Sequence, residues 1–148
     1  MSRRSESFQF LTKTELKALL EKAKTTDCRN YCMILLAYRH GLRASETVNI
    51  TLQNGDLDGG NIRCERLKGS IANWQQLAKD ESKAIKTWLR RRPKTNNPYL
   101  FVSERKKPIS RVQFFNIFRK LSRSIGLPSE KQHPHILKHT LGTMLANS

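Results

Sequence analysis

The chain has 148 residues, which suits one domain with a hydrophobic core of its own. Its 28 lysines and arginines outnumber 12 acidic residues and give a formal net charge of +16, so a polyanionic partner is expected, with nucleic acid the natural candidate. Residues 1–75 carry a net charge of +4 and residues 76–148 carry +12. The C-terminal half is therefore the expected electrostatic contact surface, unless the basic face is merely solvated.

Membrane association and metal binding are not expected. No apolar stretch approaches the ~18–20 residues that cross a bilayer, and residues 1–6 contain no hydrophobic signal segment. These features favour a soluble protein of the cytoplasm. The three cysteines, Cys28, Cys32 and Cys64, form no CxxC pair, so we expect free or buried thiols and neither a zinc site nor a disulfide framework.

The first forty residues predict two helices. A capping box at residues 12–15 precedes leucines and alanines at helical spacing, which predicts an amphipathic helix over about 13–24. Asp27 can cap a second helix over about 28–40 that is apolar on nearly every side, so this helix should be the central buried one. Gly41 should end it, and a short third helix follows.

The middle of the chain predicts a small antiparallel sheet. Residues 48–52 alternate briefly, two turns rich in Asn, Asp and Gly follow, and residues 62–67 and 71–77 read as further strands. Lys68 falls at the hairpin between the last two. With the helices on either side, the sequence predicts a mainly α fold with a small antiparallel β-sheet, an α+β domain.

Two more amphipathic helices are predicted after the sheet. Residues 79–92 place Lys83, Lys86 and Arg90 on the outer face, and residues 99–102 read as a short buried extended segment. Residues 110–125 begin with a second capping box, and the aromatic residues recur at core spacing, which favours packing over base stacking. The opposite, basic face could lie against a DNA backbone; it comprises Arg111, Arg119, Lys120 and Arg123.

The segment His133-Pro134-His135-Ile136-Leu137-Lys138-His139 concentrates groups that transfer protons and bind anions. Pro134 favours the first turn of a helix, which we expect to run to about Ala146. His135, Lys138 and His139 then share one face, where imidazoles can exchange protons near neutral pH and the ammonium can hold a phosphate oxygen. Alternatively, these histidines only cap or pack the helix.

Three separated segments resemble those of the tyrosine recombinase (phage integrase) family. Gly41-Leu42-Arg43-Ala44-Ser45-Glu46 resembles the box of its first arginine, Leu67-Lys68-Gly69 its β-hairpin lysine, and His135-Ile136-Leu137-Lys138-His139 its H-x-x-R-H box. Residues 35–46 and 133–139 look most like the fimbrial phase-switch recombinases, which invert a promoter segment. The resemblance covers residues 10–148 and implies a mostly helical catalytic domain for DNA recombination, integration or inversion.

The resemblance also implies a mechanism without metal or nucleotide cofactor, in which a tyrosine attacks a phosphate of double-stranded DNA. Arg43 and Lys138 would hold the non-bridging oxygens, Lys68 would protonate the leaving 5′-oxygen, and His135 would assist proton transfer. Glu46 and His139 would support them. The helices at about 28–40 and 110–125 would pack along the duplex, so expected DNA contacts also include Arg39, Arg105, Lys106, Lys107, Arg111, Arg119, Lys120 and Arg123.

The sequence departs from the family pattern in two ways. Lys138 stands where the family usually has arginine, and lysine lacks the two-pronged grip of a guanidinium on phosphate. Only nine residues follow His139, and none is a tyrosine, so the family's nucleophile has no equivalent in this chain. We assign Tyr31 and Tyr38 to packing, and Tyr99 precedes the last box. The family's final helices, which link neighbouring protomers, are also missing, so the chain reads as truncated.

Three functions remain open at this point. The chain could be a recombinase catalytic domain that binds DNA without cleaving it alone, with other recombinase protomers as partners and a tyrosine donated in trans. It could instead be a non-catalytic regulator that occupies recombination sites, which Lys138 and the missing tyrosine favour. A generic RNA or DNA binder would explain the charge but not the three boxes.

Overall fold

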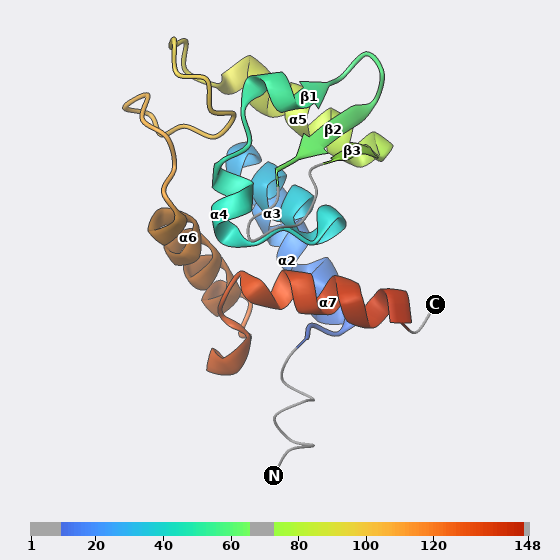
Figure 1. Cartoon of the computed structure of the whole chain (residues 1–148). Helices are drawn as coiled ribbons and strands as arrows, with labels where there is room; N and C mark the ends of the chain where they lie inside the picture. The colour runs from blue at the N-terminus through green and yellow to red at the C-terminus, as the bar shows by residue number, and fades with distance from the viewer. Residues whose placement is uncertain (1–9, 66–72, 147–148) are drawn as a thin grey trace.

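The computed structural model describes residues 10–65 and 73–146. Helices dominate these residues, and a small three-stranded sheet lies beside them, as the sequence predicts (Figure 1). In chain order the elements are α2 (Lys13–Thr26), α3 (Cys28–His40), α4 (Ala44–Val48), the 3-10 helix η1 (Leu52–Asn54), β1 (Gly55–Asp56), β2 (Asn61–Cys64), β3 (Asn73–Gln76), α5 (Lys79–Arg91), α6 (Arg111–Ser124), the 3-10 helix η2 (Ser129–Lys131) and α7 (His135–Ala146).

Helix α3 is the centre of the molecule, as its apolar sequence predicts. Asp27 caps it, since the side chain accepts a hydrogen bond from the Asn30 N–H at 3.0 Å. The chain leaves it through Gly41, whose φ of +61° is a left-handed conformation that glycine adopts without strain. Helices α2, α4, α5 and α7 all contact α3, so the hydrophobic core forms around it.

The sheet is antiparallel with the strand order β1-β2-β3. The strand predicted at residues 48–52 is wrong: this segment ends α4, makes one isolated bridge between Thr51 and Tyr99, and enters η1. The reason is local, because the Asn54 side chain accepts the Thr51 N–H at 2.7 Å and so favours a helical turn over a strand.

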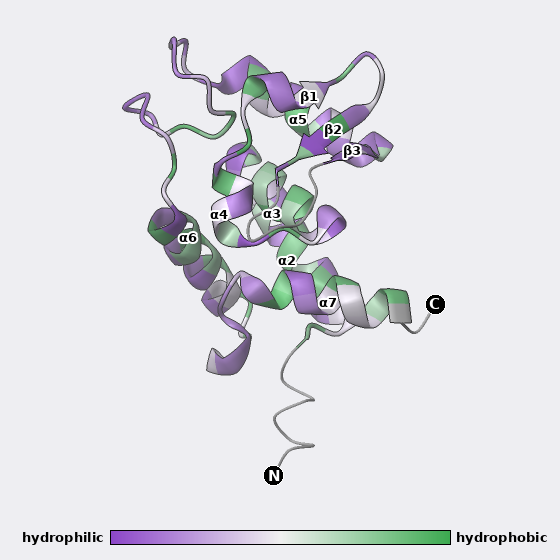
Figure 2. Ribbon diagram, viewed as in Figure 1, coloured by the Kyte–Doolittle hydropathy of each residue, from purple (hydrophilic) through white to green (hydrophobic). Residues whose placement is uncertain are grey.

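Helix α6 is amphipathic as predicted. The Ser110 side chain accepts the Gln113 N–H at 3.0 Å, and the Gln113 side chain accepts the Ser110 N–H at 2.8 Å, which is the expected capping box. Phe114 and Phe118 are fully buried, so these aromatic rings belong to the core and not to a base-stacking surface. Figure 2 shows hydrophilic and hydrophobic residues on the same helix.

The cysteines, possible metal ligands and apolar helices of the described residues bear on the predictions made from composition. Cys28, Cys32 and Cys64 are thiols outside any disulfide, and burial raises the pKa of Cys32 strongly. Among residues 10–65 and 73–146, no group of three histidine, cysteine or acidic side chains is placed to hold a metal ion. No helix in the same ranges has the length and apolar character needed to cross a membrane.

Candidate phosphodiester-binding site

The first turns of α7 present three polar side chains away from the core. Ile136, Leu137 and Thr140 are fully buried, so the intervening His135, Lys138 and His139 lie on the outer side of the helix. Thr140 fixes the helix further, because its hydroxyl accepts the backbone N–H of Leu11 at 2.8 Å. The face predicted from spacing therefore forms, with His135 and His139 exposed and Lys138 half-buried.

The segment before α7 is anchored by a buried ion pair. Lys131 in η2 lies 2.7 Å from Glu15 of α2 and is 6% exposed. The pKa of Glu15 is lowered overall: burial raises it, but the hydrogen bond and charge of Lys131 and the backbone N–H of Thr12 outweigh that effect. Glu15 therefore links the capping box of α2 to the approach of α7.

Arg43 lies at the N-cap of α4, two residues after the left-handed turn at Gly41. Its backbone is extended, and its N–H donates to the carboxylate of Glu46 at 2.8 Å. Glu46 is 6% exposed, so a buried side chain of the same box fixes the backbone of Arg43. The Arg43 side chain itself is half-buried and belongs to a surface segment.

The charges of Arg43 and Lys138 both act on His135, so the three residues lie within electrostatic range of one another. The pKa of His135 is lowered first by burial, then by His139 and His133, and then by the charges of Arg43 and Lys138. The rings of His135 and His139 meet edge to face with centroids 4.4 Å apart. A neutral imidazole near two cations can accept a proton when an anion arrives, which is the chemistry that a phosphodiester site requires.

The fourth expected catalytic residue, Lys68, lies outside the described residues. It falls in the connection between β2 and β3. The pairing of these two strands ends with Cys64 opposite Asn73, just before and just after the connection. The antiparallel pairing confirms that these strands form a hairpin. The position of the Lys68 side chain stays a prediction.

The expected DNA-contact residues differ in how they are placed. Helix α3 is buried over much of its length, and its exposed Arg39 donates to both oxygens of Asp80, at 2.7 and 3.2 Å. The basic face of α6 is exposed as predicted, and α6 contacts α4, whose N-cap is Arg43. The exposed residues of this kind are Arg105, Lys106, Lys107, Arg111, Arg119, Lys120 and Arg123.

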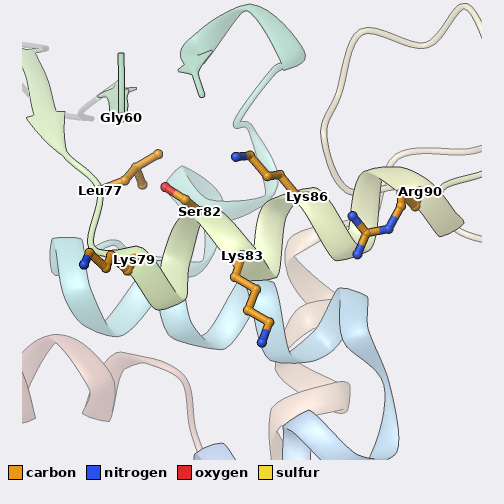
Figure 3. A pocket seen from close by; sticks show the side chains of 7 residues that line it. All are labelled: Gly60, Leu77, Lys79, Ser82, Lys83, Lys86 and Arg90. Carbon is orange, nitrogen blue, oxygen red and sulfur yellow. The ribbon is translucent and has the colours of Figure 1, made fainter. Parts of the chain in front are cut away.

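A second basic region lies on α5. Four cations at spacings of four, three and four residues share one face of the helix and line an open groove of about 600 Å³ (Figure 3). Ser82, Leu77 and Gly60 complete the lining. The sequence places three of these cations on the outer face but does not predict the groove. Gly60, in the turn between β1 and β2, lines the groove from the side of the sheet. The four are Lys79, Lys83, Lys86 and Arg90.

The three tyrosines of the chain are packed and not presented at the site. Tyr31 and Tyr38 pack against the core, as predicted, and the Tyr38 hydroxyl donates to the sulfur of Met144 at 3.1 Å. Burial, followed by the charge of Asp80, raises the pKa of Tyr31 and makes it a poorer nucleophile. Tyr99 is half-buried and forms the isolated bridge to Thr51.

Sequence reasoning missed a buried polar cluster behind the site. His40, at the end of α3, contacts Glu81 of α5 and Gln75 of β3. A signal was present, because His40 follows Met33 and Leu36 at helical spacing on the buried face of an otherwise apolar helix. Its partners are 41 and 35 residues away along the chain and have no such signal.

The fold is that of tyrosine recombinase catalytic domains. The chain belongs to the phage integrase family, whose model matches residues 9–148. It is 38% identical over 143 residues to the type 1 fimbriae regulatory protein FimB of Escherichia coli strain K12, covering 93% of this chain and 71% of that protein. It is 35% identical over 144 residues to FimE of the same strain, covering 93% and 72%.

Solved structures agree with this family assignment. The crystal structure of XerA recombinase matches with a TM-score of 0.81 and 29% identity, over 93% of this chain and 49% of that one. The structure of XerH recombinase bound to its difH substrate before cleavage has the same fold, with a TM-score of 0.79 and 22% identity over 94% of this chain and 43% of that one. The chain thus spans about half the length of the solved recombinases that it matches.

Proposed function

We propose that this domain binds duplex DNA and holds one phosphodiester at the surface formed by Arg43, Lys138 and His135. The observation that supports the proposal is that the charges of Arg43 and Lys138 both act on His135, although Arg43 comes from a box more than ninety positions away along the chain. Two cations beside an imidazole of lowered pKa fit a phosphate better than any neutral ligand. The relatives FimB, FimE and the Xer recombinases support the assignment to site-specific recombination.

The proposed roles follow from the chemistry of each group. The guanidinium of Arg43 and the ammonium of Lys138 bind the non-bridging oxygens, whose negative charge increases in the transition state. Lys68 supplies the proton for the departing 5′-oxygen, and His135 exchanges protons with the attacking or leaving group. Glu46 supports Arg43 through its backbone N–H, and His139 supports His135 through ring contact.

We further propose that residues 1–148 bind DNA without cleaving it on their own. The support is that all three tyrosines of the chain are occupied in packing or backbone pairing. Strand cleavage would then need a tyrosine from another recombinase protomer. The alternative is a regulator that occupies recombination sites without cleavage, and the lysine at position 138 favours it because lysine grips phosphate less firmly than arginine.

DNA binding is tested by titrating the protein with a mixed-sequence duplex and comparing the Arg43→Ala variant. We expect the wild-type chain to bind with a strong salt dependence, since phosphate contacts release counterions. Arg43→Ala should weaken binding by about 1–3 kcal/mol, the value of a charge-assisted contact. Binding that does not depend on salt, or that ignores Arg43, would contradict the proposal.

Cleavage is tested with a nicked suicide DNA substrate, on which a tyrosine recombinase accumulates a covalent protein–DNA adduct. We expect no adduct with this chain alone. An adduct that forms only after addition of a full-length relative, and that carries the relative's tyrosine, would support donation in trans. An adduct mapped to Tyr31, Tyr38 or Tyr99 would show that the packing argument is wrong.

A further inference from the structure

His40 is a buried histidine with both ring nitrogens engaged. Its side chain is 4% exposed, its Nε2 lies 2.5 Å from Glu81 Oε2, and its Nδ1 lies 2.7 Å from Gln75 Oε1. Glu81 is equally enclosed, with a side-chain exposure of 3%. Burying an ionisable pair costs desolvation energy that apolar side chains of similar volume would avoid, so the cluster requires an explanation beyond packing.

The hydrogen bonds fix the orientation of the His40 ring. Gln75 donates from its Nε2 to Asn73 at 3.2 Å, which leaves its Oε1 as the acceptor facing His40. A carboxylate also only accepts, and the other oxygen of Glu81 already accepts the Ala78 N–H at 2.9 Å. Both nitrogens of His40 therefore face oxygen atoms, so two directional hydrogen bonds hold the ring between β3 and α5.

His40 and Arg43 are three residues apart, in a backbone segment that hydrogen bonds restrain. Only Gly41 and Leu42 separate them, and Gly41 is fixed in the left-handed turn. Leu42 is 2% exposed, and its N–H donates to the Ala37 carbonyl at 2.9 Å. Because Glu46 holds the Arg43 N–H, the backbone between the imidazole and Arg43 has little freedom to rotate independently.

The partners of His40 belong to the segments that flank the hairpin connection. Gln75 lies in β3, the strand that follows the connection containing Lys68, and pairs with Ile62 of β2. Glu81 lies in the first turn of α5, which begins three residues after β3 ends. The cluster thus joins the end of α3, strand β3 and the start of α5 at one buried point.

We propose that His40 and Glu81 form a positioning pair that fixes the Arg43 turn relative to strand β3 and the start of α5, and so sets the orientation in which Arg43 meets a DNA phosphate. The inference rests on the proposed function, since it assigns the pair an effect on DNA binding through Arg43. Neither residue touches DNA. A hydrophobic pair could fill the same space. It would lack the directional hydrogen bonds that fix the orientation of α3 relative to β3 and α5.

The test is a double-mutant cycle on DNA affinity with Glu81→Gln, Arg43→Ala and the double variant. Glu81→Gln keeps the shape of the side chain and removes its charge. If the pair acts through Arg43, Glu81→Gln should weaken binding about fivefold in the wild-type background and by less than about twofold when Arg43 is alanine. A pair that only stabilises the fold would give the same factor in both backgrounds.

Asp27→Ala provides the matched control. It removes a cap at the opposite end of the same helix and lowers stability without approaching Arg43. Asp27→Ala should leave the DNA affinity unchanged both in the wild-type background and in the Arg43→Ala background, below the temperature at which either variant unfolds. Should Glu81→Gln fail to fold, Gln75→Ala removes the other hydrogen bond of His40 from a half-buried strand position and should show the same dependence on Arg43.

The outcomes separate this inference from the proposed function. Equal factors for Glu81→Gln in both backgrounds, with Arg43→Ala still weakening binding, would overturn the positioning role and leave the DNA-binding proposal intact. No effect of Arg43→Ala would overturn both. The positioning role would be established if Glu81→Gln weakens binding only when Arg43 is present. Asp27→Ala should leave binding unchanged in the same experiment.

Discussion

Gly41 and Leu141 set the distance between α3 and α7. A β-carbon built on Gly41 would lie 3.1 Å from Leu141 Cδ2, closer than ordinary side-chain contact allows. Gly41 precedes Arg43 by two residues, and Leu141 lies on the helix that begins with His135. The close approach of these two helices is therefore part of what brings the first-arginine box and the histidine box together.

We expect Gly41→Ala to destabilise the protein by about 2–4 kcal/mol, because it adds a steric conflict to the cost of a left-handed backbone. Gly60→Ala is the control: Gly60 also has a positive φ of +70°, but apart from its chain neighbours no atom of the described residues lies within 4 Å of the added carbon. It should cost only about 1–2 kcal/mol. Urea unfolding of both variants measures the difference, and equal destabilisation would show that Leu141 can move aside.

DNA affinity should rise as the pH falls through the region just below 6.5, which is the ordinary pKa of a histidine side chain. Burial and the neighbouring cations lower the pKa of His135, so its ring is neutral in the free protein near pH 7. A bound phosphate favours the protonated ring, so binding takes up a proton and lower pH strengthens it. Calorimetric titration in buffers of different ionisation enthalpy measures this uptake.

His135→Gln should flatten that pH dependence, whereas His133→Gln should leave most of it. Burial also lowers the pKa of His133, so both histidines make the free protein less stable as the pH falls below 6.5. The sign follows because the unfolded chain binds more protons than the folded one in this range. An affinity that decreases with falling pH in the folded protein would contradict the role of His135.

The basic face of α6 should contribute more to DNA binding than the groove of α5. Arg119→Gln with Lys120→Gln removes two charges from the helix that contacts α4, while Lys83→Gln with Lys86→Gln removes two from the α5 groove. The log-log salt slope should fall by about 0.9 for each phosphate that the variant no longer neutralises, so the α6 variant should show the larger change. Equal changes for both variants would indicate that total charge alone determines binding.

Lys138→Arg should tighten DNA binding. Arginine can donate two parallel hydrogen bonds to a phosphate, and lysine cannot. Position 138 is half-buried on the outer face of α7. We expect a gain of about 0.5–1.5 kcal/mol, the net value of one added hydrogen bond, in equilibrium binding assays. Lys138→Ala is the companion variant and should weaken binding.

The amino-acid sequence alone determined the helices and the chemistry of the boxes. Capping boxes at Thr12 and Ser110, the left-handed turn at Gly41 and the outward face of α7 all depend on residues within one or two turns of each other. Such patterns can be read from the chain because the interacting groups are neighbours in sequence. The family resemblance can also be read from the chain, because each of its boxes is a contiguous segment.

Which partners the polar groups find depends on contacts between distant parts of the chain. The tertiary structure assigned residues 48–52 to a turn fixed by Asn54, paired Arg39 with Asp80, and enclosed His40 between Glu81 and Gln75. It also brought Arg43 within electrostatic range of His135. These outcomes depend on how α3, α5 and α7 pack, and burial makes an unpaired polar group costly. Residues far apart in the chain therefore select each other only once the core has formed.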